Sequence, residues 1–260
     1  MTQTLDLVAD VGESFGAYTL GDDEALLGVL TSANVACGFH AGDPQVMDRT
    51  VAACRRRGVA VGAHPSFPDR HGFGRRAMAL TEEEVRLDVM YQIGALSAFT
   101  AAHGMRIQHV TPHGALGNLV VTRADYARAV IDAATTVHPD IIFLAQEGEL
   151  ADLARQRGLP LAIFGIADRN YEDDGTLVSR SKENAVLHDP DLIAARTVRM
   201  VTEGIIDSIH GRPIPIQCDS ILLHGDNPDS IEVARKTREA LLQAGVRLAP
   251  VAEILHTKVA

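Results

Sequence analysis

The sequence predicts an α/β protein organised around a parallel β-sheet. Short apolar segments alternate with longer amphipathic segments along nearly all of its 260 residues. Capping residues precede several of the amphipathic segments, and a glycine follows several of them, as expected for helices. This alternation is typical of strand–helix–strand units, in which crossover helices cover a parallel sheet. Two architectures fit: a closed (β/α) barrel, which takes about 250 residues, and an open doubly wound sheet.

Eight apolar segments are expected to be strands. They are short, as buried strands are, and turn-forming or polar residues bound them. In chain order they are residues 5–9, 32–37, 59–63, 106–111, 140–145, 160–166, 220–224 and 246–249.

Seven amphipathic segments between these strands are expected to be helices. Thr81 and Glu84 form a capping-box pattern, Pro44 suits a first helical turn, and Gly58 and Gly104 each follow a helix. The seven are residues 22–30, 44–57, 82–103, 123–137, 147–157, 190–203 and 229–244.

Two segments interrupt the alternation of predicted strands and helices. Residues 171–187 contain an Asp174-Gly175 turn and are expected to form a hairpin, and residues 205–217 are expected to form a second one around Gly211. Since no linker rich in Pro, Gly or Ser occurs, we expect residues 1–260 to form a single domain with two hairpin excursions.

Composition narrows the functional class. The formal net charge is −10, from 24 basic and 34 acidic residues, which disfavours binding to nucleic acid or to an anionic membrane surface. The longest clean apolar runs, such as residues 141–145, are too short to span a bilayer, and the first ten residues show no secretory signal. The three cysteines form no C-x-x-C pair, so we expect reduced thiols in a cytoplasmic protein.

Polar side chains follow the ends of six predicted strands. They are Asp10 and Glu13, His40, His64, His113 and Asn118, Asp168 and Arg169, and His224 and Asp226, in chain order. Because the carboxyl ends of parallel strands share one rim, where ligands of such folds bind, we expect these side chains to form one site.

Five of these residues are the predicted catalytic group: Asp10, Glu13, His40, His64 and His113. Burying this many acids and imidazoles together is costly unless a ligand, a metal or a reaction uses them. They suit either general acid/base catalysis or metal-assisted hydrolysis, with Asp10, His40, His64 and His113 as candidate ligands of a divalent metal. Cys37 has no base beside it in the sequence, so an activated water is favoured over a covalent intermediate.

The remaining strand-end residues are expected to bind substrate. Arg75 and Arg76, in GFGRR, are candidate anion binders, and Arg169 and Arg180 are further candidates for holding a carboxylate. Asp43 is expected to be a helix cap. The other histidines are expected to have ordinary structural roles: His71, His103, His109, His138, His188, His210 and His256.

Seven motifs taken together resemble the LamB/YcsF family. They are DVGESFGAY, SANVACGFHAGDP, GAHPSFPDRHGFGRR, YQIGALSAF, PHGALGN, ADRNYEDDGTLVSRS and HGDNP, in order between about residues 5 and 245. The resemblance implies an irregular, TIM-like (β/α) barrel of about seven parallel strands, of the glycoside hydrolase/deacetylase type. It also implies ATP-dependent 5-oxoprolinase activity, in which the lactam amide of 5-oxo-L-proline is cleaved to L-glutamate together with 5-oxoprolinase B and C subunits.

The chain departs from the usual family pattern at three positions. Val8 stands where asparagine is common, Thr111 replaces a lysine, and Gly117 replaces a tyrosine. These differences keep two alternatives open: a metal-dependent hydrolase or deacetylase acting alone on another small amide or cyclic substrate, and a regulatory subunit without catalysis. No G-x-x-x-x-G-K-[ST] loop occurs, so we expect ATP to bind at a site built with partner subunits. The sequence leaves homo-oligomerisation open.

Overall fold

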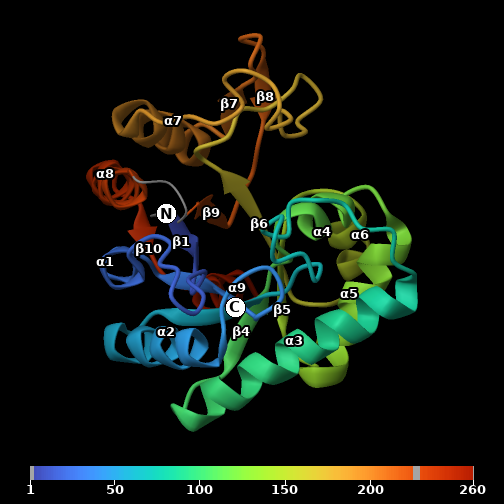
Figure 1. The fold of residues 1–260 in the computed structure, drawn as a ribbon. Helices are drawn as coiled ribbons and strands as arrows, with labels where there is room; N and C mark the ends of the chain where they lie inside the picture. The colour runs from blue at the N-terminus through green and yellow to red at the C-terminus, as the bar shows by residue number, and fades with distance from the viewer. Residues whose placement is uncertain (1–2, 225–228, 260) are drawn as a thin grey trace.

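Seven parallel strands close into a barrel in the computed structural model, which describes residues 3–224 and 229–259 (Figure 1). The ring closes because β1 pairs with β2 on one edge and with β9 on the other. In order around the ring, the strands are β1 (Thr4–Val11), β2 (Ser32–Ala36), β3 (Ala60–His64), β4 (Ile107–Val110), β5 (Ile142–Ala145), β6 (Leu161–Ile166) and β9 (Ser220–Leu223). The closed barrel is therefore confirmed over the open sheet.

The eighth predicted strand, β10 (Arg247–Leu248), lies outside this ring. It pairs with Thr4 and Leu5 at the start of β1, whereas β9 pairs with Asp6–Ala9 farther along the same strand.

The seven predicted helices are present, with α1 shorter than expected. They are α1 (Asp23–Leu27), α2 (Pro44–Arg57), α3 (Glu82–Ala102), α5 (Ala124–Val137), α6 (Glu149–Gln156), α7 (Pro190–Thr202) and α8 (Ser230–Gln243). The predicted capping box starts α3, since the Glu84 amide donates to Thr81 Oγ1 (3.2 Å) and the Thr81 amide donates to Glu84 Oε2 (2.7 Å). The sequence did not predict α4 (Gly114–Leu119) or α9 (Val251–Val259).

The two excursions differ in regularity. Strands β7 (Ile205–Asp207) and β8 (Pro213–Pro215) form an antiparallel hairpin, and Gly211 adopts a φ of 79° in its turn. Residues 171–187, by contrast, form a mostly irregular loop, in which isolated antiparallel bridges such as Tyr171–Leu177 flank the Asp174-Gly175 turn.

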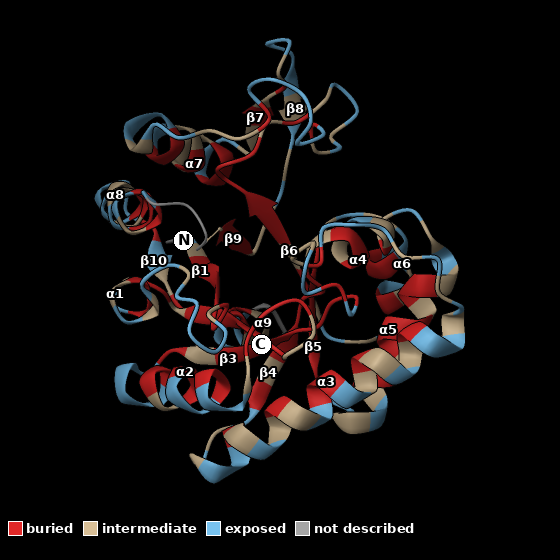
Figure 2. Ribbon diagram, in the orientation of Figure 1, coloured by how far each residue is buried: buried red, intermediate tan, exposed pale blue. Residues whose placement is uncertain are grey.

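Two apolar layers hold the barrel, one between strands and helices and one inside the ring (Figure 2). On β1, Leu5, Leu7 and Ala9 belong to the outer layer, whereas Val8 belongs to the inner one. Val251 of α9 packs into the same inner cluster, so the C-terminal helix helps to fill the barrel interior.

The inner wall of the barrel is divided by polarity. Strands β5, β6 and β9 contribute an apolar part, formed by Ile142, Leu144, Ala162, Phe164, Ile166 and Leu222. Strands β1 to β4 contribute buried polar side chains, including Asp10, Asn34, His64 and His109. Asp6 is also fully buried, and hydroxyl groups of Thr31, Ser32 and Ser220 donate to its carboxylate.

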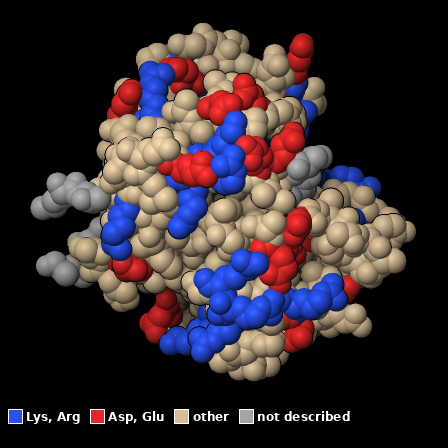
Figure 3. Space-filling model, turned by 90° about the vertical axis from the view of Figure 1, so that its left-hand side faces the viewer, with Lys and Arg blue, Asp and Glu red and all other residues tan. Residues whose placement is uncertain are grey.

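The face formed by α1, α2 and α8 carries basic and acidic side chains side by side (Figure 3). Ion pairs there include Arg57–Glu24 (2.9 Å) and Lys236–Asp191 (2.7 Å). Among the residues that the structure describes, no helix combines the length and the apolar character needed to cross a membrane.

Candidate active site

Glu13 and His40 meet just beyond the ends of β1 and β2. His40 Nε2 lies 3.0 Å from Glu13 Oε1, and both side chains are buried. Arg70 secures the short loop that carries His40, because its guanidinium donates to the carbonyls of Gly38 and Gly42. Asp43 caps α2 as predicted, by accepting from the Val46 amide (2.9 Å).

Backbone carbonyls fix the tautomers of His64 and His113. His64 Nδ1–H donates to the Thr111 carbonyl (2.6 Å), and His113 Nε2–H donates to the Phe73 carbonyl (2.9 Å). In the neutral rings, His64 Nε2 and His113 Nδ1 then both present lone pairs across a gap of 2.9 Å. That contact is repulsive unless a proton or a metal cation lies between the two nitrogens. Ring nitrogens oriented in this way by carbonyl acceptors are typical of metal-binding histidines.

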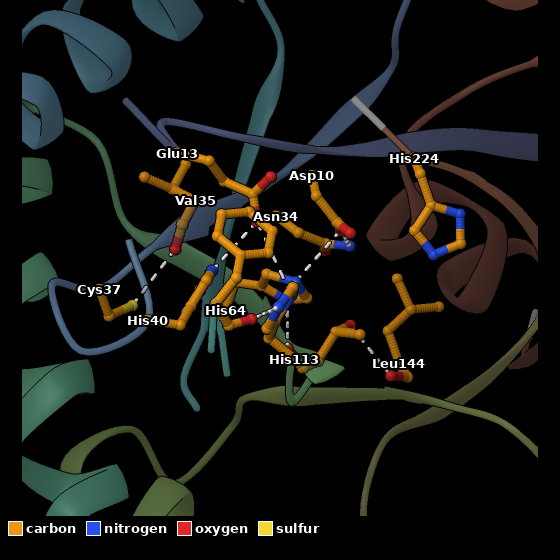
Figure 4. Close-up of polar contacts among 12 residues, drawn as sticks. Asp10, Glu13, Asn34, Val35, Cys37, His40, His64, His113, Leu144 and His224 are labelled. Carbon is orange, nitrogen blue, oxygen red and sulfur yellow. Dashed lines mark hydrogen bonds and ion pairs between the residues drawn. The ribbon is translucent and has the colours of Figure 1, made fainter. Parts of the chain in front are cut away.

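Four ligand atoms converge at this point (Figure 4). Glu13, His40, His64 and His113 each offer one atom, and all of these atoms lie within 4.8 Å of one another. Glu13 takes the place in this set that the sequence predicted for Asp10. Asp10 is adjacent instead, with Oδ1 3.3 Å from His64 Nε2.

Burial keeps two of these imidazoles neutral. It lowers the pKa of His40, and the neighbouring charges of His64, Arg70 and Arg75 add to the effect. It also lowers the pKa of His113, with His40 and His64 adding to it. Neutral imidazole is the form that binds metal, and one carboxylate with three imidazoles suits a divalent ion such as zinc. Burial alone would raise the pKa of Asp10, but the charge of His64 and its hydrogen bond outweigh burial and lower it.

The loop at residues 72–76 packs against the His40 and His113 rings of the cluster. Gly74 has a φ of 64°, and a Cβ there would lie 2.8 Å from His40 Cβ and 2.9 Å from His113 Cδ2. Only glycine therefore lets this loop approach the rings closely. Arg76 pairs with Asp69 and does not border the cavity described next, whereas Arg75 does.

A cavity of about 620 Å³ opens beside the cluster. Asp10, His64 and His113 line one side, and Leu144 and Phe164 belong to the apolar part of the wall. The predicted substrate-binding residues Asn118, Arg169 and His224 also line it, as does Arg180. Asp226 lies outside the described residues.

Thr111 and Gly117, two of the positions that depart from the family pattern, both border this cavity. Thr111 Oγ1 donates to the Leu144 carbonyl (3.0 Å), so its hydroxyl is engaged in joining β4 to β5. A Cβ on Gly117 would lie 2.4 Å from the Pro112 carbonyl oxygen. A tyrosine at this position would therefore require a different backbone path for α4.

His224 and Asp168 form a dyad at the ends of β9 and β6. His224 Nδ1 lies 2.9 Å from both carboxylate oxygens of Asp168. Burial alone would lower the pKa of His224, but the charge of Asp168 and its hydrogen bond outweigh burial and raise the pKa. Asp168 is itself buried and reaches the cavity only through His224.

Arg169 has a different environment from the expected carboxylate anchor. Its Nε donates to the Ala185 carbonyl (3.1 Å) and its Nη2 to the Val178 carbonyl (2.5 Å). Burial lowers its pKa to about 10, and the nearby charge of Arg180 adds to the effect. Arg169 thus fastens the loop at 171–187 over the cavity.

Sequence reasoning missed two side chains beneath the cluster, Asn34 and His109. Asn34 Nδ2 donates to Asp10 Oδ1 (3.0 Å), and His109 Nε2 lies 2.8 Å from Asn34 Oδ1. His109 was assigned an ordinary structural role, and Asn34 lies within an apolar run. The signal that could have found them is the alternation along a barrel strand, which points His109 into the same interior as Thr111.

The chain is similar in sequence to members of one known family. The model of the LamB/YcsF family matches residues 5–256. A protein named as a 5-oxoprolinase A subunit from Thermococcus onnurineus (strain NA1) is 50% identical over 253 residues, covering 97% of this chain and 99% of that protein. Another protein named as a 5-oxoprolinase A subunit, from Gluconobacter oxydans (strain 621H), is 48% identical over 245 residues, covering 94% of this chain and 96% of that protein.

Solved structures that resemble this chain support the same family assignment. The crystal structure of the lactam utilization protein from Thermus thermophilus superposes with a TM-score of 0.90 at 42% identity, covering 95% of this chain and 99% of that one. A structure described as T48 deacetylase with substrate has a TM-score of 0.52 at 16% identity, covering 98% and 92% of the two chains, which shows the shared fold alone. The expected likeness to the deacetylase type of barrel is thus confirmed. With a family match along nearly its whole length and relatives at about half identity, this chain belongs to the LamB/YcsF family.

Proposed function

We propose that this chain is the A subunit of an ATP-dependent 5-oxoprolinase, in which it cleaves the lactam amide of 5-oxo-L-proline to release L-glutamate. The observation that carries the proposal is the convergence of Asp10, Glu13, His40, His64 and His113 at one side of a closed-barrel cavity. Relatives named as 5-oxoprolinase A subunits support the same reaction.

The carboxylates and imidazoles activate the attacking water in this proposal. Asp10 lies at the cavity wall beside His64 and accepts the proton that water loses as its oxygen adds to the lactam carbonyl. Its lowered pKa keeps it ionised. Glu13, His40, His64 and His113 would hold a divalent metal, which supplies Lewis-acid polarisation and a more acidic bound water.

The His224–Asp168 dyad supplies the second proton transfer. The ring nitrogen of a lactam must be protonated as its bond to the carbonyl carbon breaks. His224 lines the cavity, and its raised pKa keeps the donating form populated to higher pH. Asp168 orients the ring through Nδ1 and leaves Nε2 to face the substrate.

Other subunits complete the enzyme in this proposal. Relatives that are named as one lettered component of 5-oxoprolinase support a multi-subunit complex, and we propose 5-oxoprolinase B and C subunits as the partners. Because the chain has no G-x-x-x-x-G-K-[ST] loop, we assign the ATP site to the complex with those subunits. The three free thiols favour a cytoplasmic location.

Reconstitution tests the reaction. The chain, co-purified with its B and C subunits, is expected to release glutamate from 5-oxo-L-proline only when ATP is present. Each component omitted in turn serves as the control. A complete complex that hydrolyses ATP without forming glutamate would rule out this substrate.

A divalent metal is expected to be present in stoichiometric amount in the purified chain. Elemental analysis of wild type and of His113→Ala checks this, because the variant loses one of four donors and should retain far less metal. Chelation should abolish activity, and the metal should restore it. Full activity in metal-free protein would restrict the cluster to proton transfer.

A second candidate is a metal-dependent hydrolase that acts alone on another small amide. The four-donor cluster favours it. Hydrolysis of an amide by the isolated chain without ATP would support this candidate over the first.

A further inference from the structure

Four neighbouring strands place four residues in one row across the inner wall of the barrel. Asp10 on β1 is in register with Asn34 on β2, Asn34 with Gly62 on β3, and Gly62 with His109 on β4. The row lies directly below His64, which follows Gly62 by two residues on the same strand. Of its four members, only Asp10 lines the cavity.

Hydrogen-bonding capacity fixes the direction of every contact in this row. The ionised Asp10 carboxylate can only accept, so the amide nitrogen of Asn34 must face it, at 3.0 Å. The amide oxygen of Asn34 then faces His109 Nε2 at 2.8 Å, and His109 must be the donor. Asp10 and His109 therefore hold the Asn34 amide in one orientation from its two ends.

Gly62 makes this reach possible. A Cβ at Gly62 would lie 2.0 Å from His109 Nε2 and 2.3 Å from its Cδ2 and Cε1. The imidazole thus crosses β3 through space that any side chain at position 62 would fill. His109 is fully buried, and burial lowers its pKa to about 3, so the ring stays neutral. The contact with Asn34 Oδ1 places its one proton on Nε2.

We propose that His109 and Asn34 are positioning residues, which hold the Asp10 carboxylate against His64 through hydrogen bonds across the barrel. This inference rests on the proposed function, in which Asp10 accepts a proton from the attacking water. The Asn34 amide donates to Asp10 Oδ1, and this contact fixes the oxygen at 3.3 Å from His64 Nε2. Without the His109 contact, the Asn34 amide oxygen loses its donor, so the amide and the carboxylate that it holds are free to shift together.

The test compares two substitutions of His109 in the complete complex. His109→Phe keeps the ring volume without a donor, so kcat should fall by about 10–100-fold, as when other supporting contacts of active sites are removed. His109→Gln places an amide N–H at similar reach and should retain kcat within about threefold of wild type, with KM little changed in both variants. Gly62→Ala displaces the same ring and should resemble His109→Phe.

His138→Phe is the matched control, because this histidine hydrogen-bonds Ser97 in the outer helical layer, far from the row. Thermal unfolding of each variant identifies any that fail to fold. The inference is overturned if His109→Phe keeps wild-type kcat, or if His109→Gln loses as much as His109→Phe in folded protein.

A crystal structure of the His109→Phe chain provides a readout that needs no activity. The Asp10 carboxylate should turn away from His64, and an unmoved carboxylate would overturn the inference whatever the substrate. If the wild-type complex itself cleaves no lactam, the proposed function fails, and this structural comparison still decides the role of His109.

Discussion

Replacing His64 by alanine is expected to lower the rate of lactam cleavage by about 10²–10⁴-fold, the range typical of lost acid/base catalysis. His64 Nε2 lies 3.3 Å from Asp10 Oδ1 and 2.9 Å from His113 Nδ1, so its ring joins the proton acceptor to the candidate metal ligands. The substitution removes both connections at once. The expected loss appears mainly in kcat and is measured as glutamate release by the reconstituted complex, together with a loss of bound metal.

His103→Ala is the control for this substitution, because His103 pairs with Asp48 at the surface between α3 and α2. It should leave kcat unchanged. Circular dichroism of His64→Ala should match wild type, since the variant keeps the strand pairing of β3. An active His64→Ala enzyme, within about threefold of wild type in kcat/KM, would remove the cluster from the mechanism.

Replacing Asp168 by asparagine is expected to reduce kcat by a similar factor, about 10²–10⁴-fold, and to change the pH profile. Asp168 raises the pKa of His224 against the opposing effect of burial. The protonated form of His224 is the proposed donor, so wild-type activity should fall as pH rises through this raised pKa. In Asp168→Asn the pKa of His224 drops, and the fall in activity should begin at lower pH. Initial rates measured over a range of pH give both kcat and the pH at which activity falls.

Asp48→Asn offers a matched control, since it removes the carboxylate from another Asp–His pair, one at the surface. Its pH profile should coincide with that of wild type. A decline that moves to higher pH in Asp168→Asn, or does not move, would show that His224 is not the proton donor.

The barrel and the location of its candidate site were predicted from simple patterns in the sequence. The alternation of short apolar and longer amphipathic segments predicts parallel strands with crossover helices, and closure matches the family resemblance. Asp10, Glu13, His40, His64 and His113 were predicted together because parallel strands bring their carboxyl ends to one rim. This rule depends on topology alone, so it needs no side-chain detail.

Other features depend on contacts that a one-dimensional pattern does not contain. Helix α4 is six residues long and includes Gly114 and Gly117, so it resembles a strand-end turn in sequence. His109 shows no local sign of its role, because that role comes from register with Gly62 and Asn34 on other strands.

The partners of two arginines also could not be predicted from the sequence. Arg76 was predicted to bind an anion from its place in GFGRR, and Arg169 from its place at a strand end, but Arg76 pairs with Asp69, and Arg169 donates to two backbone carbonyls of residues 171–187. Sequence reveals that a guanidinium is present, whereas its partners depend on where the loops fold.

The apolar part of the barrel's inner wall affects product release. One side of the cavity is apolar and suits the methylene carbons of a compact cyclic amide. It is formed by Leu144, Phe164, Ile166 and Leu222. Ring opening creates an ammonium group and a second carboxylate, and neither can be hydrated against such a surface. Hydrolysis therefore converts a substrate that suits the apolar wall into a product whose charges that wall leaves poorly solvated. The same wall that favours binding of the cyclic amide thus favours release of the amino acid.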